Sequence, residues 1–298
     1  MNASQTETPS KPFNRMQHAT LYVVATPIGN LADISARAVE ILGSVAAIAA
    51  EDTRVTRHLL DHRSITARLI ALHAHNEERA AREVLDILAG GASVALVSDA
   101  GTPAISDPGA RLVGMAREAG YTVSPIPGAN AAAAAVSVSG FMSPHFLFYG
   151  FLPARGSARR TELAALVALP YSLVFYEAPH RVAECVADLA VVFGAERRIL
   201  IARELTKLFE ETQVCALSEA AAWLAADAHR GKGEFVLVVE GVAASSTTEA
   251  VDVEKTLKAL LDELPLKQAV ALAVKITGGS RNELYQRALE LKREQVNG

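Results

Sequence analysis

Short apolar runs alternate with longer amphipathic segments through the first half of the chain. The runs at residues 21–26, 45–50 and 93–97 are mostly apolar, as expected of strands that are buried on both faces. Amphipathic helices are expected between them, one capped by Asp33 and running to Leu42, and another at residues 76–88. This alternation predicts an α/β fold with a mainly parallel sheet covered by helices.

The pattern changes near Gly140, where the apolar runs come closer together. Runs that predict strands lie at residues 146–151, 173–176, 198–202, 210–217 and 234–240, and helical patterns lie at 158–167 and 179–193. A second α/β domain with a mixed sheet is therefore expected. Residues 243–250 are small and polar, as in a linker, and three short helices follow, broken at Pro265 and at Gly278-Gly279.

Composition and charge narrow the class of protein. The chain has 298 residues, half of them hydrophobic, which suits two domains with sizeable cores. A net charge of −4 is unlike that of a protein that coats nucleic acid, so any RNA contact must come from local basic clusters. The two cysteines, Cys185 and Cys215, match no metal or redox spacing.

The lengths of the apolar runs indicate where in the cell the protein is expected. No apolar run reaches the roughly 18 residues that a membrane helix needs. Residues 1–20 are polar and lack the apolar core of a signal peptide. We therefore expect a cytoplasmic protein with no membrane partner and with a disordered tail at residues 1–19.

A long loop follows the strand at residues 93–97. It contains two glycines, two prolines, two aspartates, two serines and a threonine between Ser98 and Gly109. In open α/β sheets, ligands bind beyond the carboxyl ends of the strands, and loops of this length are usually functional. Shorter Gly/Pro turns end two other strands, at residues 26–30 and 127–130. Together the three turns predict a backbone-lined ligand site, although a merely long connection is the alternative.

Several common sites are absent from the sequence. It contains neither Gly-x-Gly-x-x-Gly nor Gly-x-x-x-x-Gly-Lys-Ser/Thr, which disfavours dinucleotide and P-loop triphosphate binding. His73 and His75 are spaced to face the same way on a strand, and we interpret them as surface or hydrogen-bonding side chains. No metal site is expected.

Charged residues follow four of the predicted strands. Glu51 and Asp52 could act as a base or pair with Arg54 and Arg57, although helix capping by Asp52 or Thr53 explains them as well. The segments 175–181 and 202–207 place polar groups directly after strands, where a salt-bridged turn is the alternative. A basic cluster follows the strand at 146–151 and could grip phosphates or simply begin a solvated helix; it consists of Arg155, Arg159 and Arg160.

With these residues in view, the chain resembles the tetrapyrrole-methylase superfamily. Within it, the chain is most similar to the branch that methylates the 2′-hydroxyl of a cytidine in small-subunit ribosomal RNA. The resemblance rests on nine segments in one order, at residues 21–30, 51–54, 73–77, 97–109, 125–128, 148–153, 175–181, 202–207 and 233–241.

The resemblance implies two α/β domains, at residues 20–139 and 140–243, with S-adenosylmethionine in the cleft between them. A small helical extension is implied at 253–296. Matched residue by residue, the cofactor contacts fall on Ala100, Gly101, Thr102, Ile105, Ser106, Asn130, Ala131, Tyr176 and Glu177. Pro27, with Gly29, would line the same site on the acceptor side. Tetrapyrrole-methylating relatives read Gly-Asp-Pro where this chain reads Gly101-Thr102-Pro103, so a role of that aspartate does not transfer.

The implied reaction needs a base for a ribose hydroxyl, which is a poor nucleophile while protonated. Asp52 or Glu51 is the predicted base, and Lys207 could lower the pKa of the hydroxyl or hold the adjacent phosphate. The predicted RNA contacts are Arg54, Arg57, Arg155, Arg159, Arg160 and Arg181. The expected partner is small-subunit ribosomal RNA or the small ribosomal subunit, and a homodimer is expected because family members commonly dimerise. A tetrapyrrole methyltransferase and a non-catalytic RNA-binding or ribosome-assembly module are the alternatives.

Overall fold

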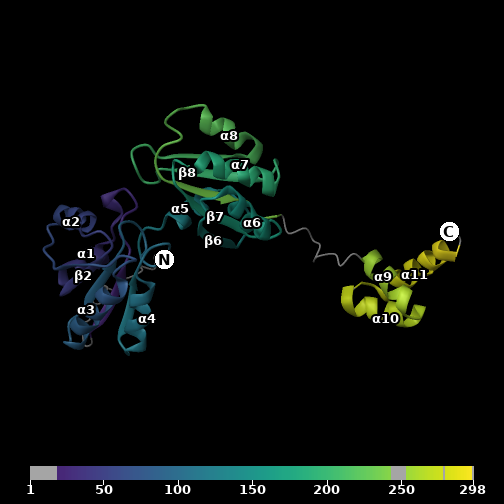
Figure 1. Ribbon diagram of the computed structural model, residues 1–298, viewed down its shortest axis with the longest axis horizontal. Coiled ribbons are helices and arrows are strands. Elements are labelled where there is room, and N and C mark those ends of the chain that lie inside the picture. The colour runs from purple at the N-terminus through teal and green to yellow at the C-terminus, as the bar shows by residue number, and fades with distance from the viewer. Residues whose placement is uncertain (1–18, 243–252, 278, 297–298) are drawn as a thin grey trace, which may run out of the picture. The chain divides into compact units, whose positions relative to one another are not determined.

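The computed structural model describes residues 19–242, 253–277 and 279–296. The chain divides into a compact unit that ends at Gly241 and a second that begins at Val242 (Figure 1). Residues 1–18 of the predicted tail, the predicted linker at 243–250, and Gly278 lie outside the described residues. Among the helices that the structure describes, none is long and apolar enough to cross a membrane.

The first sheet is wholly parallel, with the strand order β3-β2-β4-β1-β5. Its strands are β1 (Thr20–Val24), β2 (Ala47–Ala50), β3 (Leu69–Ala71), β4 (Val94–Val97) and β5 (Thr122–Ile126). The helices between them are α1 (Ala36–Ser44), α2 (Thr53–His62), α3 (Glu77–Ala89) and α4 (Ala110–Glu118). The predicted parallel sheet is confirmed, because a helix crosses over after each of the first four strands.

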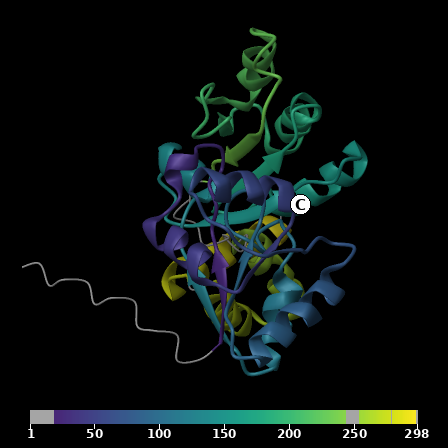
Figure 2. The same ribbon diagram turned by 90° about the vertical axis from the view of Figure 1, so that its left-hand side faces the viewer.

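Two apolar layers cover this sheet. Helices lie on both faces of the sheet (Figure 2). On one face, Leu21 and Leu96 pack with α3 and α4, and on the other face Tyr22 and Val97 pack with α1 and α2. All four residues of β2 and of β4 are buried, as expected of strands covered on both sides. Ligands can therefore reach this sheet only at the ends of its strands.

One predicted helix start differs from the structure. The hydroxyl of Ser35, and not Asp33, caps α1 by accepting a hydrogen bond from the amide of Ala38 at 3.1 Å. Asp33 instead ends a short 3-10 turn, η1 (Leu31–Asp33), which Asn30 caps. Because this turn has its own capping residue, the chain starts α1 two residues later than the pattern indicated.

The second sheet is mixed, with the order β6-β7-β10-β8-β9 and a parallel pair only between β6 and β7. Its strands are β6 (Phe146–Phe151), β7 (Ser172–Glu177), β8 (Arg198–Arg203), β9 (Glu211–Ala216) and β10 (Phe235–Val239). In register, Phe235 lies opposite Glu177 on one side and Arg203 on the other. The ends of β7 and β8 therefore meet the start of β10 at one edge of the sheet.

Helices cover the second sheet unequally. The helices α6 (Gly156–Leu166), α7 (Val182–Phe193) and α8 (Leu217–Ala225) pack on one face around Phe175 and Leu237. The sequence pattern did not predict α8. The other face holds α5 (Ala131–Val138), whose Ala132 and Ala135 pack on Val174 and Val238. The helix α5 thus follows the first sheet in the chain but lies on the second.

The described part of the second unit is a small bundle of α9 (Val253–Glu263), α10 (Leu266–Thr277) and α11 (Arg281–Val296). Its core contains Leu257, Ala269, Ala273 and Leu284. The breaks between helices fall at Pro265 and before Arg281, which confirms the predicted periodicity of this region.

Candidate functional site

Three loops meet at the carboxyl ends of β1, β4 and β5. The amide of Thr26 donates to the carbonyl of Gly101 at 2.8 Å, and the amide of Gly101 donates back to Thr26 at 3.0 Å. The hydroxyl of Thr102 donates to the carbonyl of Ala129 at 3.3 Å. The long loop after β4 is therefore fixed on both sides by the two shorter turns, as the three Gly/Pro turns predicted.

The backbone of the long loop is strained at several positions. Gly101 has a φ of +78°, and the non-glycine residues Ala104 and Ser106 each have a φ of +66°. Such conformations each cost about 1–3 kcal/mol for residues with a side chain and cluster at ligand sites. Gly150, in an irregularity of β6, lies so close that an added Cβ would be 2.9 Å from the Ser106 hydroxyl oxygen. The loop therefore contacts the second sheet as well as the first.

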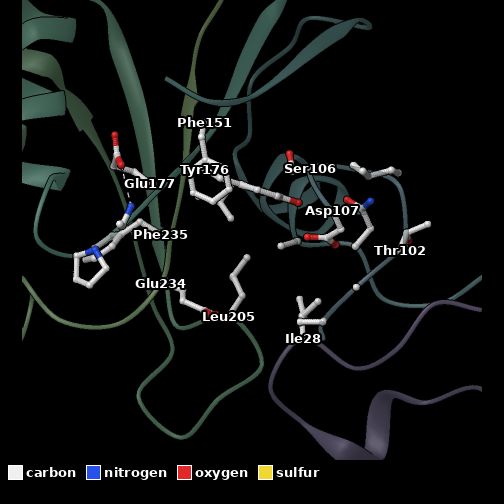
Figure 3. Close-up of a pocket in the computed structure, with 18 residues that line it drawn as sticks. Ile28, Thr102, Ser106, Asp107, Phe151, Tyr176, Glu177, Leu205, Glu234 and Phe235 are labelled. Atoms are coloured by element: carbon white, nitrogen blue, oxygen red, sulfur yellow. Dashed lines mark hydrogen bonds between the residues drawn. The ribbon is translucent and has the colours of Figure 1, made fainter. Parts of the chain in front are cut away.

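A cavity of about 370 Å³ lies against this loop, and residues of both sheets line it (Figure 3). We call it the first cavity. Nine of the ten predicted cofactor positions line it, with Pro27 as the exception: Ala100, Gly101, Thr102, Ile105, Ser106, Asn130, Ala131, Tyr176 and Glu177. Figure 3 shows Ile28 and Thr102 on one side of the cavity and Tyr176 and Phe235 on the other.

The wall of the first cavity is largely apolar. It includes Ile28, Phe151, Leu205 and Val236, which the sequence analysis did not identify as site residues. The ring of Tyr176 packs edge-to-face with Phe151 at a centroid distance of 5.7 Å. A flat or apolar group of a ligand would therefore be desolvated here.

A few polar groups interrupt this wall. Asp107 lines the cavity, and burial raises the pKa of its carboxyl group, with a further increase from the charge of Asp99. The side chain of Asn130 caps α5 by accepting from the amide of Ala133 at 3.0 Å. Because Ala131 begins α5, the positive end of that helix dipole lies at the cavity wall.

Glu177 lines the cavity, but its carboxylate is already bound. Its Oε1 lies 3.1 Å from Nε of Arg181 and accepts from the amide of Ala178 at 2.9 Å. Its side chain is fully buried. Arg181, predicted as an RNA contact, also donates to the carbonyl of Leu152 at 2.6 Å. This pair therefore fixes the turn after β7.

A second cavity, of about 240 Å³, adjoins the first and shares Ile28, Ala100 and Glu234 with it. Pro27, Gly29, His58, Asp99 and Lys207 also line it. Its residues come mainly from the turn after β1, from α2 and from the start of the long loop. The predicted acceptor-side residues Pro27 and Gly29 thus lie beside the cavity that holds the predicted cofactor residues.

The predicted catalytic residues differ in their surroundings. Lys207 points into the second cavity, and its Nζ lies 2.8 Å from Glu204 and 2.9 Å from Glu234. Burial alone would lower the pKa of Lys207, but these two carboxylates raise it. The ammonium group is therefore charged at neutral pH.

Asp52 forms a close ion pair with Arg54, with Oδ2 and Nη2 2.6 Å apart, and also caps α2. These hydrogen bonds from Arg54 lower the pKa of Asp52 to about 2. Glu51 is different, because burial and the charges of Asp107 and Asp99 raise its pKa. Neither Glu51 nor Asp52 lines the first or the second cavity, whereas Asp99, to which the sequence assigned no role, lines the second one.

The predicted RNA-binding arginines differ in how exposed they are to solvent. Arg54, Arg57 and Arg155 are exposed, and Arg54 and Arg57 border one shallow hollow at the start of α2. Arg160 is half-exposed and bound to Asp188 at 2.7 Å. The geometry removes Arg159 from this basic surface, because it is 1 % exposed and its Nη2 lies 2.6 Å from Asp188. A phosphate cannot reach it.

Substituting Arg159 by methionine is expected to lower the free energy of unfolding by about 3 kcal/mol, because it leaves the buried Asp188 with one partner fewer. Burial would raise the pKa of Asp188, but Arg160 and Arg159 together lower it. The ion pair therefore stabilises the fold above the unfolded pKa of about 4, and the difference from wild type should shrink at lower pH. Denaturant unfolding measures both effects. Arg57→Met, at an exposed position, should change stability by less than about 0.5 kcal/mol, and equal losses would contradict the assignment.

The histidines that the structure describes show no arrangement for a metal. His73 and His75 lie in the turn after β3, with ring centroids 6.1 Å apart and planes at 64°. Within the described ranges, no group of three His, Cys, Asp or Glu side chains could hold a metal ion.

Two solved structures have a fold similar to that of this chain. A cobalt precorrin-4 methyltransferase matches with a TM-score of 0.58 at 14 % identity, covering 76 % of this chain and 96 % of that one. A diphthine synthase matches with a TM-score of 0.59 at 16 % identity, covering 75 % and 90 %. At such identities the likeness shows the fold alone. It confirms the predicted two-domain α/β architecture.

The fold and the two adjoining cavities thus define an α/β protein with two sheets and a candidate ligand site that residues of both sheets line. The chain belongs to the family of tetrapyrrole (corrin/porphyrin) methylases, whose model matches residues 20–221. Residues 247–292 match a second model, the RsmI C-terminal HTH domain. The predicted family is therefore confirmed.

Similar chains from two bacteria carry the same name. A Pseudomonas aeruginosa protein called ribosomal RNA small subunit methyltransferase I is 49 % identical, over 92 % of this chain and 98 % of that protein. The protein of the same name from Vibrio cholerae is 48 % identical, over 91 % and 94 %. The similarity covers nearly the full length of those proteins.

Proposed function

We propose that this chain transfers a methyl group from S-adenosylmethionine to the 2′-hydroxyl of a cytidine in small-subunit ribosomal RNA. The observation that carries the proposal is that residues from four separate segments, at 100–106, 130–131, 151 and 176–177, line one cavity beside a second cavity that contains a fixed lysine. Relatives about half identical to this chain and named for methylation of this RNA support the choice of acceptor.

The residues of the first cavity fit the cofactor. Its volume of about 370 Å³ falls within the range of about 300–1,000 Å³ typical of small-molecule sites. Its wall combines apolar side chains with left-handed backbone at Gly101 and Ser106 and a carboxyl group at Asp107. S-adenosylmethionine, when bound, supplies a methyl group on a positively charged sulfur. Gly101, Thr102, Ala131 and Tyr176 would hold it, and Asp107 would balance its charge.

The second cavity would receive the acceptor ribose. Lys207 is charged there and cannot serve as a base, so its role is to hold the phosphate next to the target or to stabilise the oxygen as it loses its proton. Positioning of the two reactants in adjoining cavities supplies much of the rate of such a transfer.

The proton of the hydroxyl needs a carboxylate within reach of the second cavity. Asp99 lines that cavity, and one of its oxygens is fixed by the amide of Asp52 at 2.9 Å. Asp52 itself is neutralised by Arg54 and has a low pKa, which makes it a weak base. We therefore propose Asp99 as the proton acceptor, with Glu51 behind it, in place of Asp52.

RNA contacts outside the cavities would come from exposed cations. Arg54, Arg57, Arg155 and the half-exposed Arg160 remain candidates for phosphate contacts. The helices α9–α11, which match a helix-turn-helix model, are a second candidate surface. We also expect a homodimer in the cytoplasm, as the family resemblance implies.

Incubation with radiolabelled S-adenosylmethionine tests the function. Wild-type protein is given small ribosomal subunits, naked small-subunit RNA, or a uroporphyrinogen in parallel, and calorimetry measures cofactor binding. Label in the RNA of at least one RNA sample and none in the tetrapyrrole is expected. Label in the tetrapyrrole alone would favour a tetrapyrrole methylase, and absence of cofactor binding would favour a non-catalytic RNA-binding protein.

A further inference from the structure

The connection from β8 to β9 is strained at two residues that have side chains. Glu204 has a φ of +51° and Thr206 a φ of +67°. Such a conformation persists only where surrounding contacts enforce it, and it clusters at functional sites. The connection reaches both cavities, because Leu205 lines the first and Lys207 the second.

Glu204 is held by several contacts at once. Its amide donates to the carbonyl of Glu234 at 2.9 Å, and its Oε1 accepts from the amide of Glu234 at 2.9 Å. The same oxygen lies 2.8 Å from Nζ of Lys207. Gly233 leaves room for this side chain, since an added Cβ there would lie 2.5 Å from Cγ of Glu204. The carboxylate of Glu204 is therefore fixed before any ligand binds.

Lys207 is held from the other side by the turn after β1. Its aliphatic stem lies across Gly29, where an added Cβ would come within 2.4 Å of Cγ of Lys207. The turn after β1 thus offers a surface without a side chain, and the stem of the lysine covers it. A lysine side chain has four rotatable bonds and samples many rotamers when it is unrestrained. Here both its stem and its ammonium group are placed.

Two carboxylates touch this ammonium group, but they differ in burial. The side chain of Glu204 is 17 % exposed, whereas that of Glu234 is 77 % exposed, although their distances to Nζ are 2.8 and 2.9 Å. An exposed ion pair is screened by water and contributes little to orientation. Glu204 has the additional hydrogen bond from the backbone and is the better anchor.

We propose that Glu204 is a positioning residue that aims the ammonium group of Lys207 into the second cavity, where it contacts a phosphate or the target hydroxyl of the RNA. The inference rests on the proposed function of that cavity. It assigns the backbone strain and the two glycines, Gly29 and Gly233, to one purpose, which is to fix this lysine. Glu204 acts only through Lys207 and does not touch the substrate.

A double-mutant cycle tests the proposal. Glu204→Gln, Lys207→Ala and the double variant are compared with wild type in single-turnover methylation of small ribosomal subunits. Lys207→Ala should lower the rate constant at limiting RNA by about tenfold to a hundredfold, the usual effect of losing a charge-assisted contact. Glu204→Gln should lower it by a smaller factor, and should lower it no further when Lys207 is already alanine.

Salt dependence gives a readout that a folding defect would not change. If Lys207 contacts a phosphate, Lys207→Ala reduces the slope of log affinity against log salt for the RNA by about one, and Glu204→Gln reduces it in the same direction. Glu234→Gln should have a smaller effect than Glu204→Gln, and Glu83→Gln, in an exposed pair with Arg68, should match wild type. Gly29→Ala displaces the stem of the same lysine from the turn after β1 and should resemble Lys207→Ala. It provides a second test of the proposal if Glu204→Gln fails to fold.

The outcomes separate the two levels of the hypothesis. Non-additive losses support the positioning role. Equal loss from Glu204→Gln in the wild-type and Lys207→Ala backgrounds would overturn it, as would Glu204→Gln, Gly29→Ala and wild type behaving alike. Wild-type protein that binds S-adenosylmethionine but labels no RNA would overturn the proposed function, and the role of Glu204 with it.

Discussion

Replacing Gly101 by valine is expected to weaken S-adenosylmethionine binding by more than a factor of about 100, equivalent to about 2.7 kcal/mol. Gly101 lines the first cavity at a φ of +78°, and its amide and carbonyl are bonded to Thr26. An added Cβ would already contact Ile28 at 3.4 Å, and the two methyl groups of valine extend further. Titration calorimetry with the cofactor measures the loss.

The matched control for this substitution is Gly91→Val. Gly91 has a φ of +83°, nearly the same backbone strain, but an added Cβ there would meet nothing within 4 Å. It follows α3 and lines neither cavity. Both variants should lose similar stability in thermal unfolding, and only Gly101→Val should lose cofactor affinity. Equal cofactor affinity in the two variants would place the cofactor elsewhere.

Asp99→Asn is expected to reduce the single-turnover rate of methyl transfer by about 10²–10⁴, the usual contribution of a general base. Asparagine keeps the oxygen that accepts from the amide of Asp52, so the loop should keep its geometry. The affinities for cofactor and for RNA should therefore change by no more than a few-fold. Rapid-quench measurement with saturating protein separates this chemical step from binding.

Asp52→Asn serves as the comparison for Asp99→Asn. Asp52 keeps its charge to a pH of about 2 because Arg54 binds it, so its loss should affect the start of α2 more than the chemistry. If Asp52→Asn abolished transfer while Asp99→Asn did not, the base would be Asp52, as the sequence first indicated. Glu51→Gln should give an intermediate rate, because Glu51 would lie behind the proton acceptor, with a pKa that burial and the charges of Asp107 and Asp99 raise.

The sequence predicted the first sheet and the meeting of its loops for a physical reason. In a parallel sheet, the carboxyl ends of all strands lie at one edge, so turns such as those at Gly101 and Gly128 must converge there. The resemblance to a family then indicated which residues of those turns are expected to contact the cofactor. Nine of its positions line a single cavity, although their contact with the cofactor stays a prediction.

What the sequence could not show depends on contacts between distant segments. Arg159 belongs to a basic cluster in sequence, and only the fold brings Asp188, on the next helix, close enough to bury it. Phe151 and Leu205 reach the first cavity because the second sheet is placed against the long loop, and no local pattern predicts that placement. The helix α8 was missed because its N-cap residue is Ala216, whose side chain cannot cap a helix. Its start is marked only by Glu219 in the first turn, which accepts from the amide of Ala216 at 3.2 Å.

The sequence identified the loop that contains Asp99 but did not identify Asp99 itself. That loop was expected to form a ligand site, yet composition could not say which of its two aspartates faces which cavity. The structure places Asp107 at the first cavity and Asp99 at the second. The sequence also could not show that Lys207 pairs with both Glu204 and Glu234, because β9 and α8 separate Glu234 from Lys207 along the chain.

Nucleoside analysis of the product tests the central proposal most directly. Small ribosomal subunits are incubated with wild-type protein and isotopically labelled S-adenosylmethionine, the RNA is digested, and the nucleosides are separated by mass spectrometry. We expect labelled 2′-O-methylcytidine with wild-type protein, and a rate of labelling that is lower by a factor of about 10²–10⁴ with Asp99→Asn. Label on a nucleobase, on another ribose, or in no nucleoside at all would contradict it.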